Sequence, residues 1–522
     1  MSARGAALTQ VKGSHLRRSV TPWGSYAWGY ADIGADIYVA LGLVVGAAMG
    51  AANLAFAFAG LVYVCIGLAY TELAAAYPVA GGGQFFVTRA LGDFTGFIAG
   101  WAVLLDFTID ITLFAVFAIG YISALVPWLA DPHHKFTYFL LVLAIIVLLT
   151  YLNIKGVRES SRLNEIVALV DVVNETLIIF CGFLFAWHPT ILIHTMIEHW
   201  PSPEKLLLGT SLAIISFVGL ESISQAAEET QRPSSIIPRT SIGLILTILI
   251  FALAYSNLVL GMQAATTHGL VPMYQYVGSN VNQDHAVAAL ASTIPYLGTL
   301  FALYVPILAS LLVVISSNSG VFGASRIAYS MGQNELLPAW FQRVGQKTKT
   351  PILAILVFSG VAVIELVAAF LQKEQALGFL ADLYAFGASL SYTLVFCALI
   401  ALRFTDPGAP RRFKMPLNVR MTIAGRRGDV SLIAVLGLLG IFAILTFTLL
   451  THPVGRIFGP AWVVLGIIFF IAYRWRSKRP VLGSVERDWV RHHERVLANA
   501  GELEMLDEYR ENVAKENPPG TA

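Results

Sequence analysis

The sequence predicts an all-α, polytopic membrane protein with twelve transmembrane helices. Of the 522 residues, 57% are hydrophobic and only 13% are charged, whereas a soluble globular chain carries about 25% charged residues. Apolar windows of about 20 residues, the length of one crossing, recur from residue 24 to residue 475. Placing twelve helices on these windows also sorts the basic residues cleanly to one side.

The apolar windows place each helix along the chain, bounded by turn residues or charge. The expected spans lie near residues 24–47, 53–76, 94–127, 136–153, 163–187, 205–227, 239–263, 298–330, 351–371, 376–402, 430–450 and 457–475.

The basic residues predict the orientation. With the N-terminus inside, 30 of the 34 Lys and Arg fall in cytoplasmic segments, and only Lys135, Lys205, Lys373 and Arg456 fall outside. Cytoplasmic loops carry such an excess, so we expect a multi-pass protein of the cell membrane with both termini cytoplasmic.

Five segments follow from the spans and the charge runs. The amphipathic stretch "ERVLANAGELEMLDEYREN" predicts a helix in the last of them. The segments are a cytoplasmic N-terminal tail (1–20), a helical core (21–402), a basic cytoplasmic loop (403–429), the last two helices (430–476) and a cytoplasmic C-terminal tail (477–522).

Acidic residues inside the apolar spans are the main functional signal. None of the helices that carry them has Lys or Arg in its central part. Each acid costs about 2.5–3.5 kcal/mol near the bilayer centre, so the group must line a polar interior, carry protons or meet a mobile cation. The alternative for any single acid is a structural hydrogen bond between packed helices. The seven acids are Asp32, Asp36, Asp106, Asp110, Asp171, Glu175 and Glu221.

Two spans are predicted to break near mid-membrane, the first at "IGAD" (33–36) and the sixth at "SFVGLES" (216–222). Glycine inside a helix costs about 1 kcal/mol relative to alanine, and unwound backbone at membrane depth occurs only along a cavity. Helices one to five and six to ten form two sets of five with opposite directions, so the sets are predicted to be inverted repeats. Matching breaks in two such halves point to a binding site at the midplane.

Several longer motifs are similar to those of the amino acid–polyamine–organocation transporter superfamily. The resemblance covers about residues 20–475. The motifs are "YTELAAAYPVAGGGQFFVTRALG" with "GWAVLLDF", "LNIKGVRESSRLNEI", "ISFVGLESISQAAEETQRPSSIIPR" and "GASRIAYSMGQNELLP".

The resemblance implies a five-plus-five inverted repeat of the leucine-transporter type with two extra helices. It also implies alternating-access transport with substrate held at the two breaks. By this resemblance and the acid pattern, the expected substrate-binding residues are Ile33, Gly34, Ala35, Asp36, Asp110, Phe217, Val218, Gly219, Glu221 and Tyr384, with Ser389 a further candidate. The expected ion-coupling residues are Asp171, Glu175, Ser316 and Ser317. For Tyr384 and Ser389, core packing is the alternative.

Two positions depart from the family pattern in the same direction. Asp36 stands where most relatives have glycine or serine, and Asp171 stands where some proton-coupled relatives have lysine. Both changes favour a cationic amino acid, a polyamine, another amine or an alkali cation over a neutral amino acid.

The expected function is secondary active transport of an amino acid or related amine across the lipid bilayer, coupled to H+ or Na+. The alternatives are an inorganic cation (K+) transporter on the same fold and a membrane sensor that signals through the C-terminal tail. The apolar segments contain no nucleophile with its base and no His/Cys metal cluster. We therefore expect no enzyme activity, no cofactor, no metal site and no nucleic-acid partner.

Overall fold

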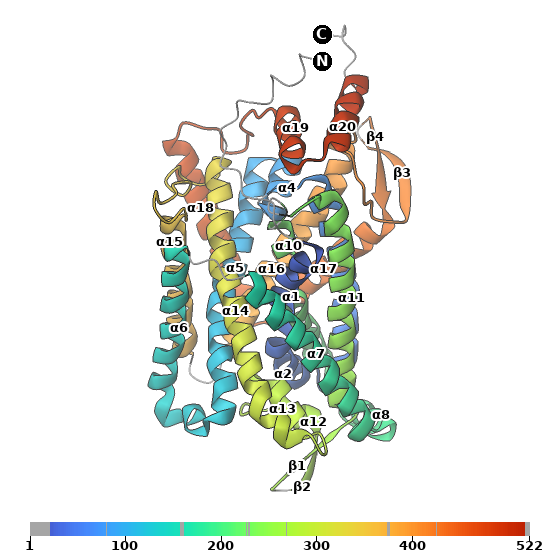
Figure 1. Cartoon of the computed structure of the whole chain (residues 1–522), viewed down its shortest axis with the longest axis vertical. Helices are drawn as coiled ribbons and strands as arrows, with labels where there is room; N and C mark the ends of the chain where they lie inside the picture. Colours follow the sequence, from blue (N-terminus) through green and yellow to red (C-terminus); the bar gives the residue numbers. More distant parts are fainter. Residues whose placement is uncertain are drawn as a thin grey trace.

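The computed structural model of the chain describes residues 21–79, 81–156, 161–225, 227, 230–267, 269–372, 376–423 and 425–516. The predicted N-terminal tail (1–20) and part of the "LNIKGVRESSRLNEI" motif lie outside these ranges. Within them the molecule is a bundle of long helices (Figure 1).

Eleven helical ranges of the described chain are long and apolar enough to cross a membrane. The first, Pro22–Ala76, has 55 residues, which is the length of two crossings at about 20 residues each. It consists of α1 (Pro22–Ile33), α2 (Asp36–Ala48), a short η1 turn (Met49–Ala51) and α3 (Ala52–Ala76).

The other long ranges agree with the predicted spans to within a few residues. They are α5 (Asp93–Leu125), α6 (Lys135–Lys155), α7 (Ser161–Phe185), α9 (Pro203–Leu212) with η4 (Ala213–Phe217) and α10 (Glu221–Gln225), α11 (Pro233–Leu260), α14 (Gly298–Gln333), α15 (Ile352–Leu371), α16 (Ala376–Thr405), α17 (Leu432–Thr451) and α18 (Gly455–Arg476).

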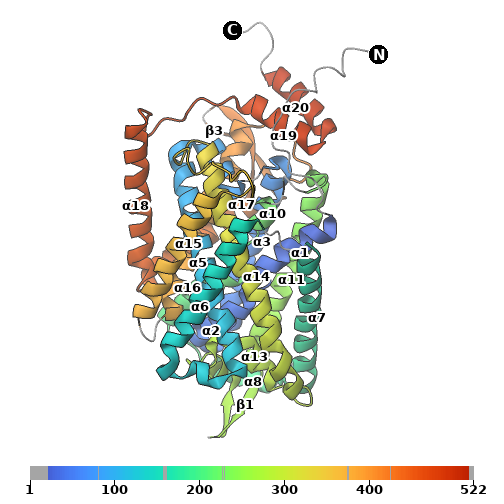
Figure 2. The ribbon, with the colours of Figure 1, turned by 60° about the vertical axis from the view of Figure 1, so that its left-hand side comes forward.

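Helix α5 forms the centre of the bundle. Its most apolar window is entirely buried, whereas only 17% of that of α6 and 22% of that of α18 is buried. α5 packs against α14, α16 and α15, and α6 and α18 lie at the outside (Figures 1 and 2). Acids on α5 are therefore held far from lipid.

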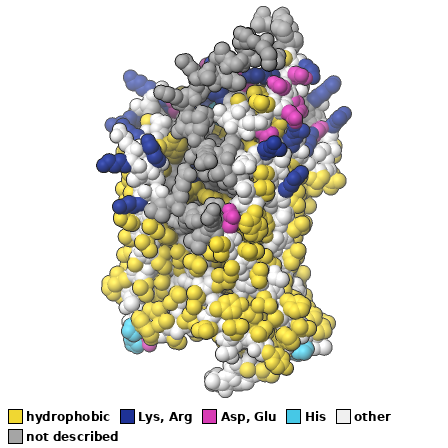
Figure 3. Space-filling model, viewed as in Figure 1, with side chains coloured by type: hydrophobic (Ala, Val, Ile, Leu, Met, Phe, Trp, Pro, Cys, Tyr) yellow, Lys and Arg dark blue, Asp and Glu magenta, His cyan; other side chains and the backbone are white. Residues whose placement is uncertain are grey.

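Charge separates the two ends of the molecule. Lys and Arg gather at one end of the molecule, which we call the tail face, above a broad apolar band (Figure 3). The tail face carries α4 (Gly82–Leu91), α19 (Trp489–Ala500) and α20 (Leu503–Glu516). The opposite end carries α8 (Pro189–Glu198), strands β1 (Gln263–Thr266) and β2 (Gly269–Pro272), α12 (Met273–Val277) and α13 (Ala286–Ser292).

Two tail-face segments differ from the sequence prediction. The expected loop 403–429 contains most of an antiparallel hairpin, β3 (Asn418–Ile423) and β4 (Arg426–Ser431), because β-branched and long apolar residues alternate with polar ones along it. The single helix expected in the C-terminal tail is two helices, since Gly501 adopts a left-handed conformation (φ +69°) that ends α19.

Candidate functional site

Both predicted helix breaks are present, and they differ in kind. Between α1 and α2, Gly34 and Ala35 form a turn whose backbone angles stay near helical values. Between η4 and α10 the chain is fully unwound, with Val218 extended and Gly219 at φ +106°. A residue with a side chain would be strained at Gly219, so the glycine permits this break.

The two breaks lie directly against each other. A β-carbon placed on Gly219 would lie 3.0 Å from Oδ2 of Asp32 and 2.9 Å from Cγ1 of Ile33. Tyr392 of α16 bridges the second break, because its hydroxyl accepts from the Gly219 N–H (3.3 Å) and donates to Oε2 of Glu221 (2.9 Å).

Five acids converge on the breaks from four helical segments. Asp106 lies near Glu221, Asp110 near Tyr384 and Asp32 near Ser222. All five are at least 95% buried. The acids are Asp32 at the end of α1, Asp36 at the start of α2, Asp106 and Asp110 in the middle of α5, and Glu221 at the start of α10.

No described Lys or Arg forms an ion pair with any of these five acids. Several of their oxygens also lack a hydrogen-bond partner in the described part of the chain, namely Oδ2 of Asp36, Oδ1 of Asp106 and Oδ1 of Asp110. A buried charge without a partner is costly, so the arrangement suits protons or a positively charged ligand.

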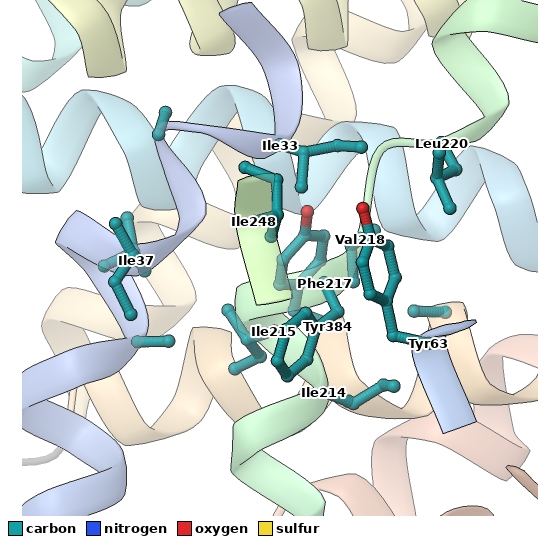
Figure 4. Packing of buried hydrophobic residues seen from close by; sticks show 14 of the residues in the cluster. Ile33, Ile37, Tyr63, Ile214, Ile215, Phe217, Val218, Leu220, Ile248 and Tyr384 are labelled. Atoms are coloured by element: carbon teal, nitrogen blue, oxygen red, sulfur yellow. The ribbon is translucent and has the colours of Figure 1, made fainter. Parts of the chain in front are cut away.

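An apolar and aromatic wall borders this acidic group. The rings of Tyr63 and Phe217 stack with centroids 4.9 Å apart. Figure 4 shows both rings with Tyr384, Ile33 and Ile37 gathered around the breaks. The site thus combines carboxylates with a surface that can contact an apolar group.

A second pair of acids, on α7, is held by tyrosines of the first broken span. Tyr30 donates to Oδ2 of Asp171 (2.9 Å) and to Oε2 of Glu175 (3.0 Å). Tyr38 donates to Oδ1 of Asp171 (2.6 Å) and accepts from Asn174 (3.2 Å). The tyrosines lie on either side of the break, so the α7 pair is connected to the site through α1 and α2.

The two predicted ion-coupling serines donate hydrogen bonds to backbone oxygens. Ser316 of α14 donates to the backbone oxygen of Asp32 (3.4 Å), and Ser317 donates to that of Ile111 on α5 (2.9 Å). Their hydrogen bonds therefore run to α1 and α5 and not to the acids of α7, because α14 packs along the length of α5. Ser316 borders the break itself.

Ser389, the further pocket candidate, is fully buried, and its hydroxyl oxygen has no hydrogen-bond partner among the described residues.

Three tyrosines and one acid around the site were not predicted from the sequence. Glu365 of α15 accepts from Thr108 of α5 (2.8 Å) and is buried. A lone acid in an apolar span was the available signal for Glu365. Tyr30, Tyr38 and Tyr392 gave no such signal, since aromatic residues in apolar spans are common.

Comparison with known proteins identifies the family. The family model described as "Amino acid permease" matches residues 24–473. The branched-chain amino acid permease BcaP of Bacillus subtilis is 26% identical over 411 residues, covering 74% of this chain and 81% of that protein. The cationic amino acid transporter 4 of Mus musculus is 27% identical over 405 residues, covering 72% of this chain and 58% of that protein. The methylthioribose transporter of Bacillus subtilis is 25% identical over 401 residues, covering 74% and 80%.

Solved structures share the fold. A manganese transporter of Eremococcus coleocola superposes with a TM-score of 0.54 at 15% identity, covering 96% of this chain and all of that one. The superposition shows a common leucine-transporter-type architecture, but at such low identity it does not show a common substrate. With the family model spanning most of the sequence, the chain belongs to the amino acid permease family, and it is a membrane transporter and not an enzyme.

Proposed function

We propose that the protein is a secondary active transporter that moves an amino acid or related amine by alternating access, with a preference for cationic substrates and coupling to H+ or Na+. We further propose that the tail face is cytoplasmic in the cell membrane, because it carries most of the Lys and Arg.

One observation carries the substrate preference: five buried acids meet at the two helix breaks without a basic partner among the described residues. A cationic group at this place would donate hydrogen bonds to the oxygens of Asp36, Asp106 and Asp110 that have no other partner there. The binding of a cation is then favoured by both Coulomb attraction and hydrogen bonding.

The two breaks suggest how an amino acid would be oriented. Free N–H groups at the start of a half-helix favour an anion, and free carbonyls favour a cation. Asp36 begins α2, so its own carboxylate competes with a substrate carboxylate for the α2 N–H groups. This arrangement supports an amine as the dominant recognised group. The wall of Tyr63, Phe217 and Tyr384 suits an apolar portion of the substrate.

The relatives transport different solutes by name, among them branched-chain amino acids and methylthioribose. Their names therefore leave the substrate of this chain open. The name of the cationic amino acid transporter agrees with the acidic site.

The α7 acids support a role in coupling. Asp171 and Glu175 share the hydroxyl of Tyr30, and Oε1 of Glu175 has no partner in the described structure. Binding a proton or Na+ there would change the hydrogen bonds of Tyr30 and Tyr38, which flank the α1–α2 break. We propose that this connection links the ion to the substrate site.

The decisive experiment is uptake into liposomes with the purified protein and the Asp36→Asn variant. We expect the wild type to take up lysine, arginine or putrescine in preference to leucine, and we expect the variant to lose tenfold or more of that uptake, since one buried charge–charge hydrogen bond contributes about 1.5–3 kcal/mol. Asp131→Asn, at an exposed acid of the opposite end, is the matched control. Unchanged uptake in Asp36→Asn would refute the role of Asp36.

An inorganic cation is the second candidate substrate. Buried acids without a basic partner can also bind K+, and the structural neighbours are named manganese transporters. The described residues contain no group of three or more His, Cys, Asp or Glu that could hold a metal ion, which counts against a divalent metal. Rubidium entry without competition by any amine would favour this candidate over the first.

A further inference from the structure

A basic pocket lies at the tail face, outside the transport site. It has a volume of about 550 Å³ between the end of α16 and the β3–β4 hairpin. Its charged lining consists of Arg403, Arg411, Lys414, Arg420, Arg427 and one acid, Asp429. The lining carries five cations and one acid, and Glu72 pairs with two of the cations from outside the lining, so an excess of positive charge remains that favours an anion.

Two of the arginines are held in place by hydrogen bonds and ion pairs with Glu72, a buried acid of α3. Arg403 donates to Oε1 of Glu72 (2.9 Å) and also to its Oε2, and Arg411 lies 3.3 Å from Oε1. Arg411 also donates to backbone oxygens at the end of α16, those of Leu402 (3.1 Å) and Asp406 (3.2 Å). These guanidinium groups are held in place before any ligand arrives, which lowers the entropy cost of binding.

The hairpin supplies the other wall and is anchored to α16. Arg403 donates to Oδ1 of Asn418 (2.5 Å), and a β-carbon on Gly428 would lie 2.8 Å from the backbone oxygen of Arg403. In the strand register, Arg420 pairs with Asp429 and Thr422 with Arg427, so the four share one face of the hairpin. Arg427 is exposed and forms no ion pair with any residue that the structure describes.

The position of the pocket indicates a lipid ligand. Ser431 ends β4 and caps α17, whose first residue, Leu432, is exposed at the start of a membrane span. Exposed apolar side chains also alternate with the polar ones along β3, where Val419, Met421 and Ile423 are 44–48% exposed and Met421 lines the pocket. Figures 1 and 3 show the hairpin at the edge of the apolar band, where the basic residues begin.

We propose that this pocket binds the phosphate of an anionic phospholipid headgroup in the leaflet next to the tail face, with the acyl chains against the exposed apolar residues beside it. Arg and Lys pair strongly with phosphate oxygens, and basic pockets at this depth are suited to anionic headgroups. Free phosphate would use the same cations but would gain nothing from the apolar rim.

The test measures lipid binding by the full-length protein in detergent with native mass spectrometry. Phosphatidylglycerol and phosphatidylcholine with the same acyl chains are titrated separately. We expect phosphatidylglycerol to bind preferentially and the Arg420→Gln/Arg427→Gln variant to bind it about 25-fold more weakly, since each cation near a charged lipid contributes about a fivefold factor. Both side chains are exposed, so the variant should fold normally.

The matched control is Arg476→Gln/Lys478→Gln, two exposed cations at the end of α18 that do not line the pocket. It should bind phosphatidylglycerol like the wild type. An equal loss in both variants, or no loss in the pocket variant, would overturn the proposal. Added glycerol 3-phosphate should displace little of the lipid, and full displacement by it at millimolar concentration would assign the pocket to a soluble phosphate instead.

Discussion

At the scale of single residues, the breaks depend on one glycine more than on the others. Gly219 has φ +106°, and its missing side chain leaves room for the Asp32 carboxylate and Ile33. Gly34, in the other break, has ordinary helical angles. The sequence alone predicted both glycines as break points, but only the structure distinguishes a strained position from an unstrained one.

We expect Gly219→Ala to lower the melting temperature of the protein and to abolish uptake. A non-glycine residue in this conformation costs about 1–3 kcal/mol, and the new methyl group would displace Asp32. Gly360→Ala in α15 is the control, because nothing lies within 4 Å of its added β-carbon. Thermal unfolding in one detergent compares the two; equal melting temperatures would contradict the strain at Gly219.

Asp171→Asn tests the proposed coupling site. The substitution removes the charge and leaves one acceptor oxygen, so the amide can accept from one tyrosine hydroxyl and donate to the other. We expect uptake at saturating substrate to persist while its dependence on pH or on Na+ changes. Initial rates measured over a range of pH and Na+ would detect the change, and identical profiles would assign Asp171 a structural role.

At the scale of elements, hydropathy predicts where the long helices lie in the sequence, but it does not predict which helices pack against each other. Apolar windows locate α5, α14 and α16 within a few residues. They cannot tell which helix is central, because a lipid-facing and a protein-facing span look alike in composition. Hence neither the hydrogen bond of Ser316 to α1 nor the tyrosine contacts of Asp171 were anticipated.

Glu72 connects α3 to α16 and to the segment before the hairpin. Its carboxylate accepts hydrogen bonds from Arg403 and from the N–H of Met415 (2.7 Å), and it forms an ion pair with Arg411. The side chain of Glu72 is completely buried. Glu72→Gln would leave two guanidinium groups without their counter-charge, so we expect a loss of about 3–5 kcal/mol in stability.

Glu504→Gln is the control for this prediction, because the Arg412–Glu504 pair is exposed and such pairs contribute little. A thermal unfolding experiment should show a clear loss for the first variant and almost none for the second. Equal melting temperatures would show that Glu72 does not hold these elements together.

At the scale of the whole molecule, the C-terminal tail folds back onto the transporter. Arg89 of α4 lies over the rings of Tyr77 and Trp489 and pairs with Asp406 (2.6 Å). His493 packs between the rings of Tyr77 and Tyr509. The sequence predicted an amphipathic tail helix but could not show where its apolar face is buried, because amphipathicity alone does not identify a partner.

This docking should weaken in acid. Burial, together with the charge of Arg89, lowers the pKa of His493 to about 3 and that of His492 to about 4, whereas free histidine has a pKa near 6.5. Below about pH 6.5 a released tail binds protons that the docked tail excludes, so docking loses about 1.4 kcal/mol per pH unit for His493 alone. The other charged groups facing the two histidines are Asp406, Arg411, Arg487 and Arg495.

Hydrogen–deuterium exchange of α19, corrected for intrinsic rates, measures the effect at pH 7.5 and 5.5. We expect faster exchange at the lower pH in the wild type. The His492→Phe/His493→Phe variant keeps the aromatic packing without the titration and should stay protected at both values. Acid-induced exchange in that variant as well would place the sensitivity elsewhere.

The five acids at the breaks also bear on the electrical behaviour of transport. A cargo with one or two positive charges cannot balance five carboxylates, and uncompensated charge at this depth is too costly to carry through a closed site. The other carboxylates must then be protonated in the loaded site, and all five in the empty site, so each positive charge of the cargo replaces one proton. Uptake of a cation would accordingly carry little net charge through the membrane, and a pH gradient would drive it more than membrane voltage.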